Sequence, residues 1–99
     1  MKRERKIFSG RSNPALAKKI AQSADCELGD ISIKTFSDGE IWVKYEENIR
    51  GQDVFIVQST NGPSENIIEL ALMTDAAVRA SASTVNIIMP YFGYGRQDR

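Results

Sequence analysis

The sequence contains no histidine and a single cysteine, and these two shortages exclude several kinds of chemistry. Without histidine the 99 residues lack the commonest general base and the commonest transition-metal ligand, so a Ser-His or Cys-His catalytic pair within them is impossible. Because Cys26 stands alone, no disulfide can form within the chain. This favours a reducing compartment, and we expect a cytoplasmic protein.

Charge of one sign and long apolar runs are also missing. The 13 basic and 13 acidic side chains cancel, which argues against the basic face that non-specific nucleic-acid binding needs. No apolar run approaches a membrane span, and the basic start at residues 1–6 leads into no apolar segment of the signal-peptide kind. The sequence therefore predicts neither a nucleic-acid partner nor a membrane partner.

The residues that are present predict one small α/β unit. Strand-like and helix-like patterns alternate, which indicates a largely parallel sheet with helices on both faces. Strands are expected at 6–9, 31–36, 41–45, 54–57 and 85–89, and helices at 14–24 and from Pro63 to Ala80.

Two features refine this expectation. Asp38-Gly39 separates the runs at 31–36 and 41–45, and Asp-Gly is a strong signal for a tight β-hairpin, which should protrude from the main sheet. The strand at 85–89 is followed by no covering helix, so we expect part of its surface to lie bare.

Three polar segments, at 9–12, 58–62 and 91–99, follow three of the expected parallel strands. The carboxyl ends of parallel strands share one edge of a sheet, where α/β proteins bind ligands, so we expect these segments to meet there. The first two lead into helix N-termini, which favour anions. The alternative is that such loops are polar in any α/β protein, and topology alone does not decide between the two interpretations.

The segment 91–99 is the richest in groups that bind polyanions, and its end at Arg99 indicates a functional loop interrupted partway. Arg96 can hold phosphate oxygens with two parallel N–H donors, and Gln97 adds a neutral amide donor. The segment completes no dinucleotide-binding fingerprint, and the chain has no P-loop. The alternative is a solvated charged tail.

The expected hairpin turn combines Phe36 with Asp38 and Glu40. An aromatic ring beside carboxylates suits a purine, because the ring can stack and a carboxylate can accept from an exocyclic amine. The alternative is ordinary turn chemistry, since Asp-Gly belongs in a hairpin whatever the protein binds. Glu46 and Glu47 are expected to form a solvated strand end.

Several short segments share their order and spacing with one enzyme family. They are 6–10, 36–40, 48–51 leading into 54–60, 69–70, 75–76, 79–82, 90–94 and 96–99. Over nearly its whole length, the chain resembles the amino-terminal third of a ribose-phosphate pyrophosphokinase (phosphoribosyl pyrophosphate synthetase). Each motif alone is modest, but in this order they are specific.

The resemblance implies an enzyme that transfers the diphosphate of Mg-ATP to the anomeric hydroxyl of ribose 5-phosphate, giving phosphoribosyl pyrophosphate and AMP. It implies a phosphoribosyltransferase-like fold, of which residues 1–99 form an incomplete N-terminal domain, with the second domain absent. The full-length parent would be a homo-oligomer, commonly a hexamer. Mg²⁺ would bind with ATP, and its protein ligands would lie beyond this chain, which alone would be inactive.

The same resemblance assigns roles to site residues. The ring of Phe36 would stack on the adenine, and the two carboxylates beside Gly39 would hold the adenine edge. No catalytic residue and no metal ligand is expected within the chain. The expected ATP-binding residues are Phe36, Asp38, Gly39, Glu40, Arg96 and Gln97.

Two other functions stay open at this point. A non-catalytic regulatory protein associated with a synthetase could keep the hairpin as a docking element. A nucleotide sensor could share the wider phosphoribosyltransferase-like fold, although the hairpin carboxylates are not a general feature of that fold.

Overall fold

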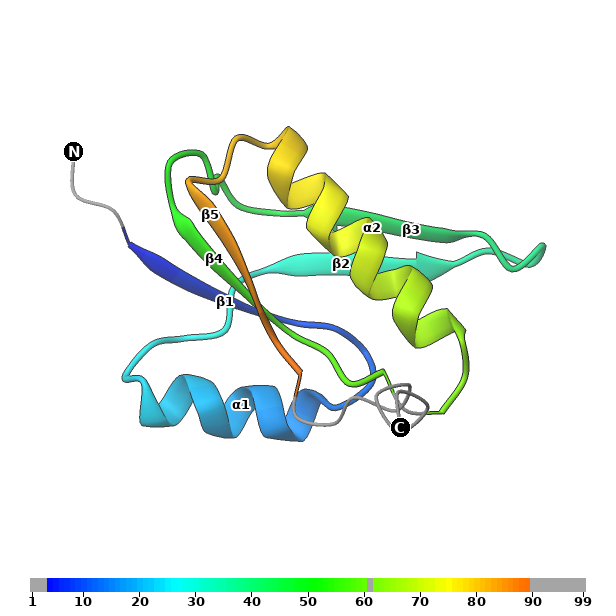
Figure 1. Ribbon diagram of the computed structural model, residues 1–99, viewed down its shortest axis with the longest axis horizontal. Helices are drawn as coiled ribbons and strands as arrows, with labels where there is room; N and C mark the ends of the chain where they lie inside the picture. Colours follow the sequence, from blue (N-terminus) through cyan, green and yellow to red (C-terminus); the bar gives the residue numbers. More distant parts are fainter. Residues whose placement is uncertain (1–3, 61, 90–99) are drawn as a thin grey trace, which may run out of the picture.

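The structure is a computed structural model, and it describes residues 4–60 and 62–89. Three strands form a parallel sheet in the order β1-β4-β5, and β2 and β3 pair as a separate antiparallel hairpin (Figure 1). The predicted α/β architecture and the protruding hairpin are therefore confirmed. The elements are β1 (Arg5–Ser9), α1 (Pro14–Ser23), β2 (Ile31–Thr35), β3 (Ile41–Tyr45), β4 (Asp53–Val57), α2 (Glu65–Arg79) and β5 (Thr84–Ile88).

The two helices lie on opposite faces of the parallel sheet, as predicted (Figure 1). Ala17 and Ala21 of α1 pack with Ile7 and Val57 on one face, whereas Phe8 belongs to the core beneath α2. Successive side chains of a strand point to opposite faces, so the neighbours Ile7 and Phe8 enter different cores. The short strand β1 thereby joins both layers.

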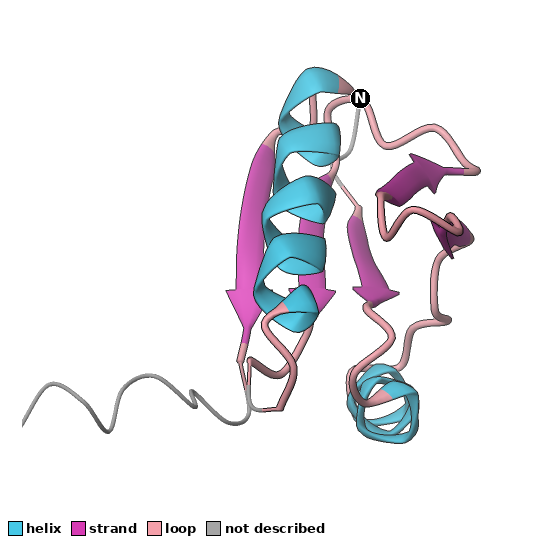
Figure 2. Cartoon of the chain, turned by 90° about the vertical axis from the view of Figure 1, so that its right-hand side faces the viewer, coloured by secondary structure: helices cyan, strands magenta, loops and turns pink. Residues whose placement is uncertain are grey.

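The hairpin forms a separate two-stranded sheet that lies beside the parallel sheet (Figure 2). Its base is fixed by Tyr45, whose hydroxyl donates to the carbonyl oxygen of Met73 in α2 at 2.8 Å. The Tyr45 ring also meets Phe8 edge-on, with 4.8 Å between the ring centroids. Burial raises the pKa of the Tyr45 hydroxyl, so this group remains a protonated donor.

The second helix begins later than predicted. Pro63 and Ser64 form a separate turn in which the N–H groups of Asn66 and Ile67 donate to their carbonyl oxygens at 3.0 Å each. These are bonds across three residues rather than four, so the helix proper starts at Glu65. The final strand is partly bare, as expected, and Ile87 is 45% exposed.

The expectation of a solvated strand end was wrong for Glu47. Its carboxylate accepts from Lys6 Nζ at 2.9 Å and from the backbone N–H of Asp30 at 2.7 Å. The backbone bond from Asp30 and the contact with Lys6 lower the pKa of Glu47, and the same contact raises the pKa of Lys6. The pair thus joins β1 to the residues just before β2 and just after β3. The sequence near Glu47 gives no sign of these contacts.

This pair predicts a pH-dependent contribution to stability. Because the pKa of Glu47 is lowered by folding, its contribution is present above the unfolded value of 4.5 and is lost as the pH falls further. Lys6 contributes below its unfolded value of 10.5, so both are present at pH 7. Glu47→Gln should reduce the free energy of unfolding at pH 7 by about 1 kcal/mol.

Urea denaturation at pH 7 and at pH 3 measures this difference directly. The deficit of the variant should shrink at pH 3, because the contribution of the ionised carboxylate is lost progressively as the pH falls below the unfolded value of 4.5. A deficit of the same size at both pH values would show that the charge of Glu47 is not responsible.

Candidate functional site

The loops after β1 and β4 meet at the carboxyl edge of the parallel sheet, as predicted. The N–H of Gly10 donates to the carbonyl oxygen of Val57 at 2.9 Å, and the Ser12 hydroxyl donates to Gln58 Oε1 at 2.6 Å. The third polar segment, 91–99, lies outside the described residues. Two of the three predicted neighbours are therefore brought together.

A topological switch point lies at this edge. Strand β1 pairs with β4 on one side and forms a parallel bridge from Ile7 to Leu28 on the other. Segments that follow β1 in the chain therefore lie on both of its sides. Ligands of open α/β sheets commonly bind in such a crevice. Here two side chains of the protein fill it, because Gln58 is 0% and Glu69 is 3% exposed.

Gly10 allows the Gln58 side chain to occupy the crevice. A Cβ atom at that position would lie 2.1 Å from Gln58 Oε1, so only glycine leaves room for the amide. We therefore place the candidate site on the outer side of the edge, toward the hairpin, rather than within the crevice.

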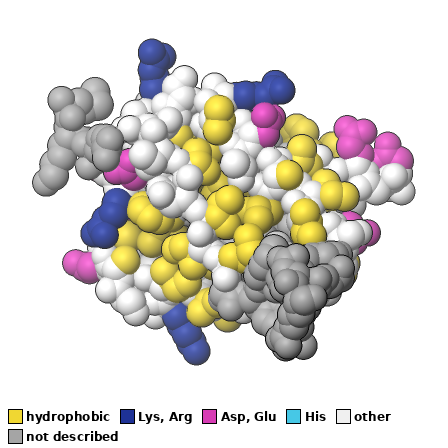
Figure 3. Space-filling model, viewed as in Figure 1, with side chains coloured by type: hydrophobic (Ala, Val, Ile, Leu, Met, Phe, Trp, Pro, Cys, Tyr) yellow, Lys and Arg dark blue, Asp and Glu magenta, His cyan; other side chains and the backbone are white. Residues whose placement is uncertain are grey.

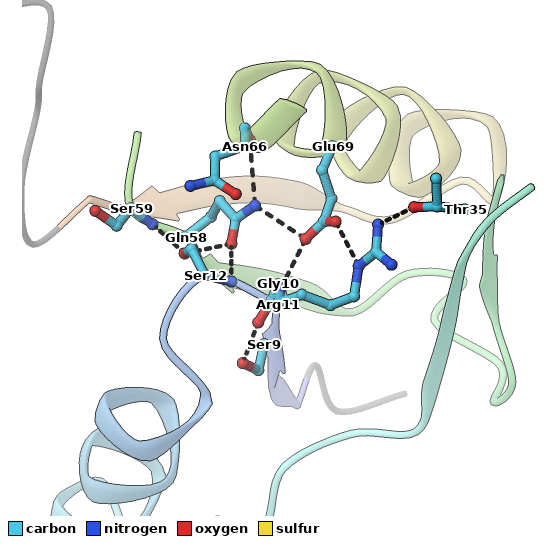
Figure 4. A network of polar contacts seen from close by, with 9 residues as sticks. All are labelled: Ser9, Gly10, Arg11, Ser12, Thr35, Gln58, Ser59, Asn66 and Glu69. Carbon is cyan, nitrogen blue, oxygen red and sulfur yellow. Dashed lines mark hydrogen bonds and ion pairs between the residues drawn. The ribbon is translucent and has the colours of Figure 1, made fainter. Parts of the chain in front are cut away.

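Glu69 is the centre of a polar network that spans the crevice (Figure 4). Its carboxylate accepts from the backbone N–H of Arg11 and from Arg11 Nε, both at 2.7 Å, and from Gln58 Nε2 at 2.9 Å. The Gln58 amide also donates to the carbonyl oxygen of Asn66 at 3.2 Å, while its oxygen accepts from Ser12. Because the side chains of Gln58 and Glu69 are buried and fully hydrogen-bonded, the network holds them in one arrangement.

Sequence reasoning missed this network, although one signal was available. Glu69 precedes Met73 by four residues and Ala77 by eight, which places a carboxylate on the buried face of α2. A charged side chain on an apolar helix face needs a partner, and the sequence alone did not identify Arg11.

The network continues from the crevice to the hairpin through Arg11. Its Nη2 donates to Thr35 Oγ1 at 2.8 Å, and Thr35 is the last residue of β2. The carboxyl edge of the sheet is thus bonded to the residue that precedes the hairpin turn.

The hairpin turn brings together the four predicted site residues that the structure describes. The turn is closed by two backbone bonds, from the Phe36 N–H to Glu40 at 2.8 Å and from the Gly39 N–H to Phe36 at 2.9 Å. Gly39 has φ +89°, which glycine adopts without strain. Asp38 Oδ1 accepts from the Glu40 N–H at 3.0 Å, so part of Asp38 performs the turn chemistry considered as the alternative.

The turn nevertheless presents groups to solvent. The Phe36 side chain is 48% exposed, and Asp38 and Glu40 are exposed beside it. Acidic side chains gather at the hairpin end of the molecule in the space-filling view (Figure 3). Arg96 and Gln97 lie outside the described residues, so their role in binding the ATP phosphates stays a prediction.

Two features are absent from the part of the chain that the structure describes. Residues 4–60 and 62–89 contain no group of three or more His, Cys, Asp or Glu side chains that could hold a metal ion. Neither helix in this part of the chain is long and apolar enough to cross a membrane.

Solved structures share this architecture. A hypoxanthine-guanine phosphoribosyl transferase from L. donovani matches 88% of the chain and 52% of its own length with a TM-score of 0.63, and at 8% identity this shows the fold alone. A phosphoribosylpyrophosphate synthetase from Mycobacterium smegmatis matches 98% of the chain with a TM-score of 0.92 and 35% identity. The predicted phosphoribosyltransferase-like fold is therefore confirmed.

Sequence comparisons identify the family. The family model of the N-terminal domain of ribose phosphate pyrophosphokinase matches residues 5–99. The chain is 57% identical over 95 residues to a ribose-phosphate pyrophosphokinase from Fusobacterium nucleatum and 56% identical over 95 residues to one from Bacillus subtilis. The chain therefore belongs to the ribose-phosphate pyrophosphokinase family. These matches cover 95% of the chain but 30% of each relative.

The network predicts a large effect of a small change at Glu69. Glu69→Gln keeps the shape but replaces one accepting oxygen with an NH₂ group, so at least one N–H donor of Arg11 or Gln58 faces another donor. We expect the free energy of unfolding to fall by about 2–3 kcal/mol.

Urea denaturation checks this value, and Glu65→Gln on the exposed start of the same helix is the matched control. The control should cost less than about 1 kcal/mol, the worth of a charge near a helix N-terminus. Equal losses in the two variants would contradict the central role of Glu69.

Proposed function

We propose that the chain is the N-terminal part of an enzyme that transfers the diphosphate of Mg-ATP to ribose 5-phosphate, giving phosphoribosyl pyrophosphate and AMP. Membership of the ribose-phosphate pyrophosphokinase family supports this activity. One observation carries the role of this segment: a half-exposed Phe36 stands beside exposed Asp38 and Glu40 on a closed turn. The proposal assigns no catalytic residue to residues 1–99.

The turn has the chemistry that adenine recognition needs. The exposed face of Phe36 can stack on the purine, and stacking of a base on an aromatic ring is tolerant of small shifts. Glu40 has no hydrogen-bond partner for its carboxylate among the described residues, so it can accept from the exocyclic amine of adenine. Asp38 keeps one oxygen for the same edge while the other accepts from the turn.

The phosphates would be held by the segment after β5. We propose that Arg96 binds phosphate oxygens with paired N–H donors and that Gln97 adds an amide donor. In this proposal Mg²⁺ binds with ATP, and its protein ligands would lie outside residues 1–99. We further propose a cytoplasmic homo-oligomer, commonly a hexamer in this family.

Phe36→Ala in the intact source protein tests the adenine contact. Loss of one base–aromatic stack costs about 1–3 kcal/mol, so KM for ATP should rise at least about fivefold while KM for ribose 5-phosphate stays unchanged. Phe36→Tyr keeps the ring and should behave as wild type. Formation of AMP and phosphoribosyl pyrophosphate at varied concentrations of each substrate gives both constants.

Two results would contradict the proposal. A folded intact protein that makes no phosphoribosyl pyrophosphate would exclude the activity, and its co-purification with a complete synthetase would then favour the non-catalytic alternative. Unchanged KM for ATP in Phe36→Ala would exclude the adenine contact alone.

A further inference from the structure

We infer that Arg11 is a positioning residue for the ATP site, because it bonds the hairpin turn to the buried network at the sheet edge. The inference rests on the proposed function, in which that turn carries the adenine contacts. Arg11 itself need not touch the nucleotide. Its guanidinium joins Glu69, which is fixed in the crevice, to Thr35, which directly precedes Phe36.

The Glu69 end of this bridge is rigid. Glu69 is 3% exposed, and it accepts from both the backbone N–H and Nε of Arg11 at 2.7 Å. Gln58 donates to the same carboxylate at 2.9 Å. Main chain and side chain of Arg11 are therefore held by one buried group, which sets the direction of the guanidinium.

The Thr35 end of the bridge is exposed and depends on the contact. Thr35 lies on the same side of β2 as Ile31 and Ile33, which pack on the core beneath α2, so its hydroxyl faces inward. The hairpin turn extends past the end of α2 (Figure 1), and Phe36 at its start is 48% exposed. Because a two-stranded hairpin is marginally stable alone, a bond at this point limits how far the turn can move.

Two side-chain hydrogen bonds link the strands of the hairpin to the rest of the molecule, one near each end, and Ile31, Ile33 and Val43 pack on the core between them. At the base of the hairpin, Tyr45 donates to Met73 of α2 at 2.8 Å, and at its turn, Thr35 accepts from Arg11 at 2.8 Å. Core packing of the hairpin reaches the Ile33–Val43 pair, so without the Arg11 bond the turn beyond that pair would be free to tilt. The Arg11 bridge is the contact that fixes the turn.

The geometry of the bridge requires arginine. Nε contacts Glu69 while Nη2 contacts Thr35, and both donors belong to one planar group (Figure 4). A lysine ammonium is a point charge without this fork, so it can keep the charge near Glu69 but not both directions. Arg11→Lys therefore keeps the positive charge beside Glu69 but removes the bridge to Thr35.

The test uses Thr35→Val in the intact source protein. Valine keeps the shape and the preference for a strand but removes the acceptor, and the bonds between Arg11 and Glu69 remain. We expect KM for ATP to rise about threefold to tenfold, with kcat, KM for ribose 5-phosphate and Tm unchanged. In the absence of nucleotide, hydrogen exchange of the amides at 36–40 should be faster. Arg11→Lys should shift both readouts in the same direction.

Thr84→Val is the matched control. Thr84 Oγ1 donates to Asp53 Oδ1 at 2.7 Å, at the opposite end of the sheet, so the same substitution there removes a hydroxyl contact without touching the bridge. This control should leave KM for ATP and the exchange at 36–40 at the wild-type values.

The outcomes separate this inference from the proposed function. Suppose that the wild-type protein has a measurable KM for ATP. If Thr35→Val and Arg11→Lys then change neither this KM nor the hydrogen exchange at 36–40, the positioning role is overturned and the proposed activity stands. A parallel rise of both KM values with a lower Tm shows a purely structural contact and also overturns it. A folded wild-type protein without product contradicts the proposed function, and the inference fails with it.

Discussion

The buried carboxylate of Glu69 is the group on which the arrangement of this molecule depends. Removing a charge from water is costly unless it is paired and hydrogen-bonded, and Arg11 and Gln58 together satisfy it. Each of these partners comes from a loop that follows a strand of the parallel sheet. One carboxylate from α2 thereby fixes two loops, and Arg11 extends the network to the hairpin.

This network changes where a ligand can be bound. In an open sheet the crevice at the switch point is the usual site, but Gln58 and Glu69 occupy it here. The exposed groups with suitable chemistry lie instead on the hairpin turn, which carries Phe36 and two carboxylates. We propose that the crevice residues act as a rigid support and that the turn provides the recognition. A binding site needs such a supporting layer to keep its contacting groups in place.

Sequence reasoning succeeded where structure is local. The alternation of patterns gave both helices and all strands, and Asp38-Gly39 located the hairpin, since these signals depend on residues close in the chain. It failed for Glu47 and missed Glu69, because their partners are distant: Arg11 and Glu69 are 58 residues apart. Pairings over such distances follow from the topology, which a single sequence does not specify. The roles of Arg96 and Gln97 stay predictions.

The central claim is that the hairpin turn binds the adenine of ATP, and photoaffinity labelling tests it most directly. The intact source protein would be irradiated with 2-azido-ATP and Mg²⁺, digested with trypsin and analysed by mass spectrometry. The account predicts labelling of the peptide 35–44, which contains Phe36, and loss of this label with excess ATP. Label on other peptides only, or label on 35–44 that ATP does not displace, would contradict it.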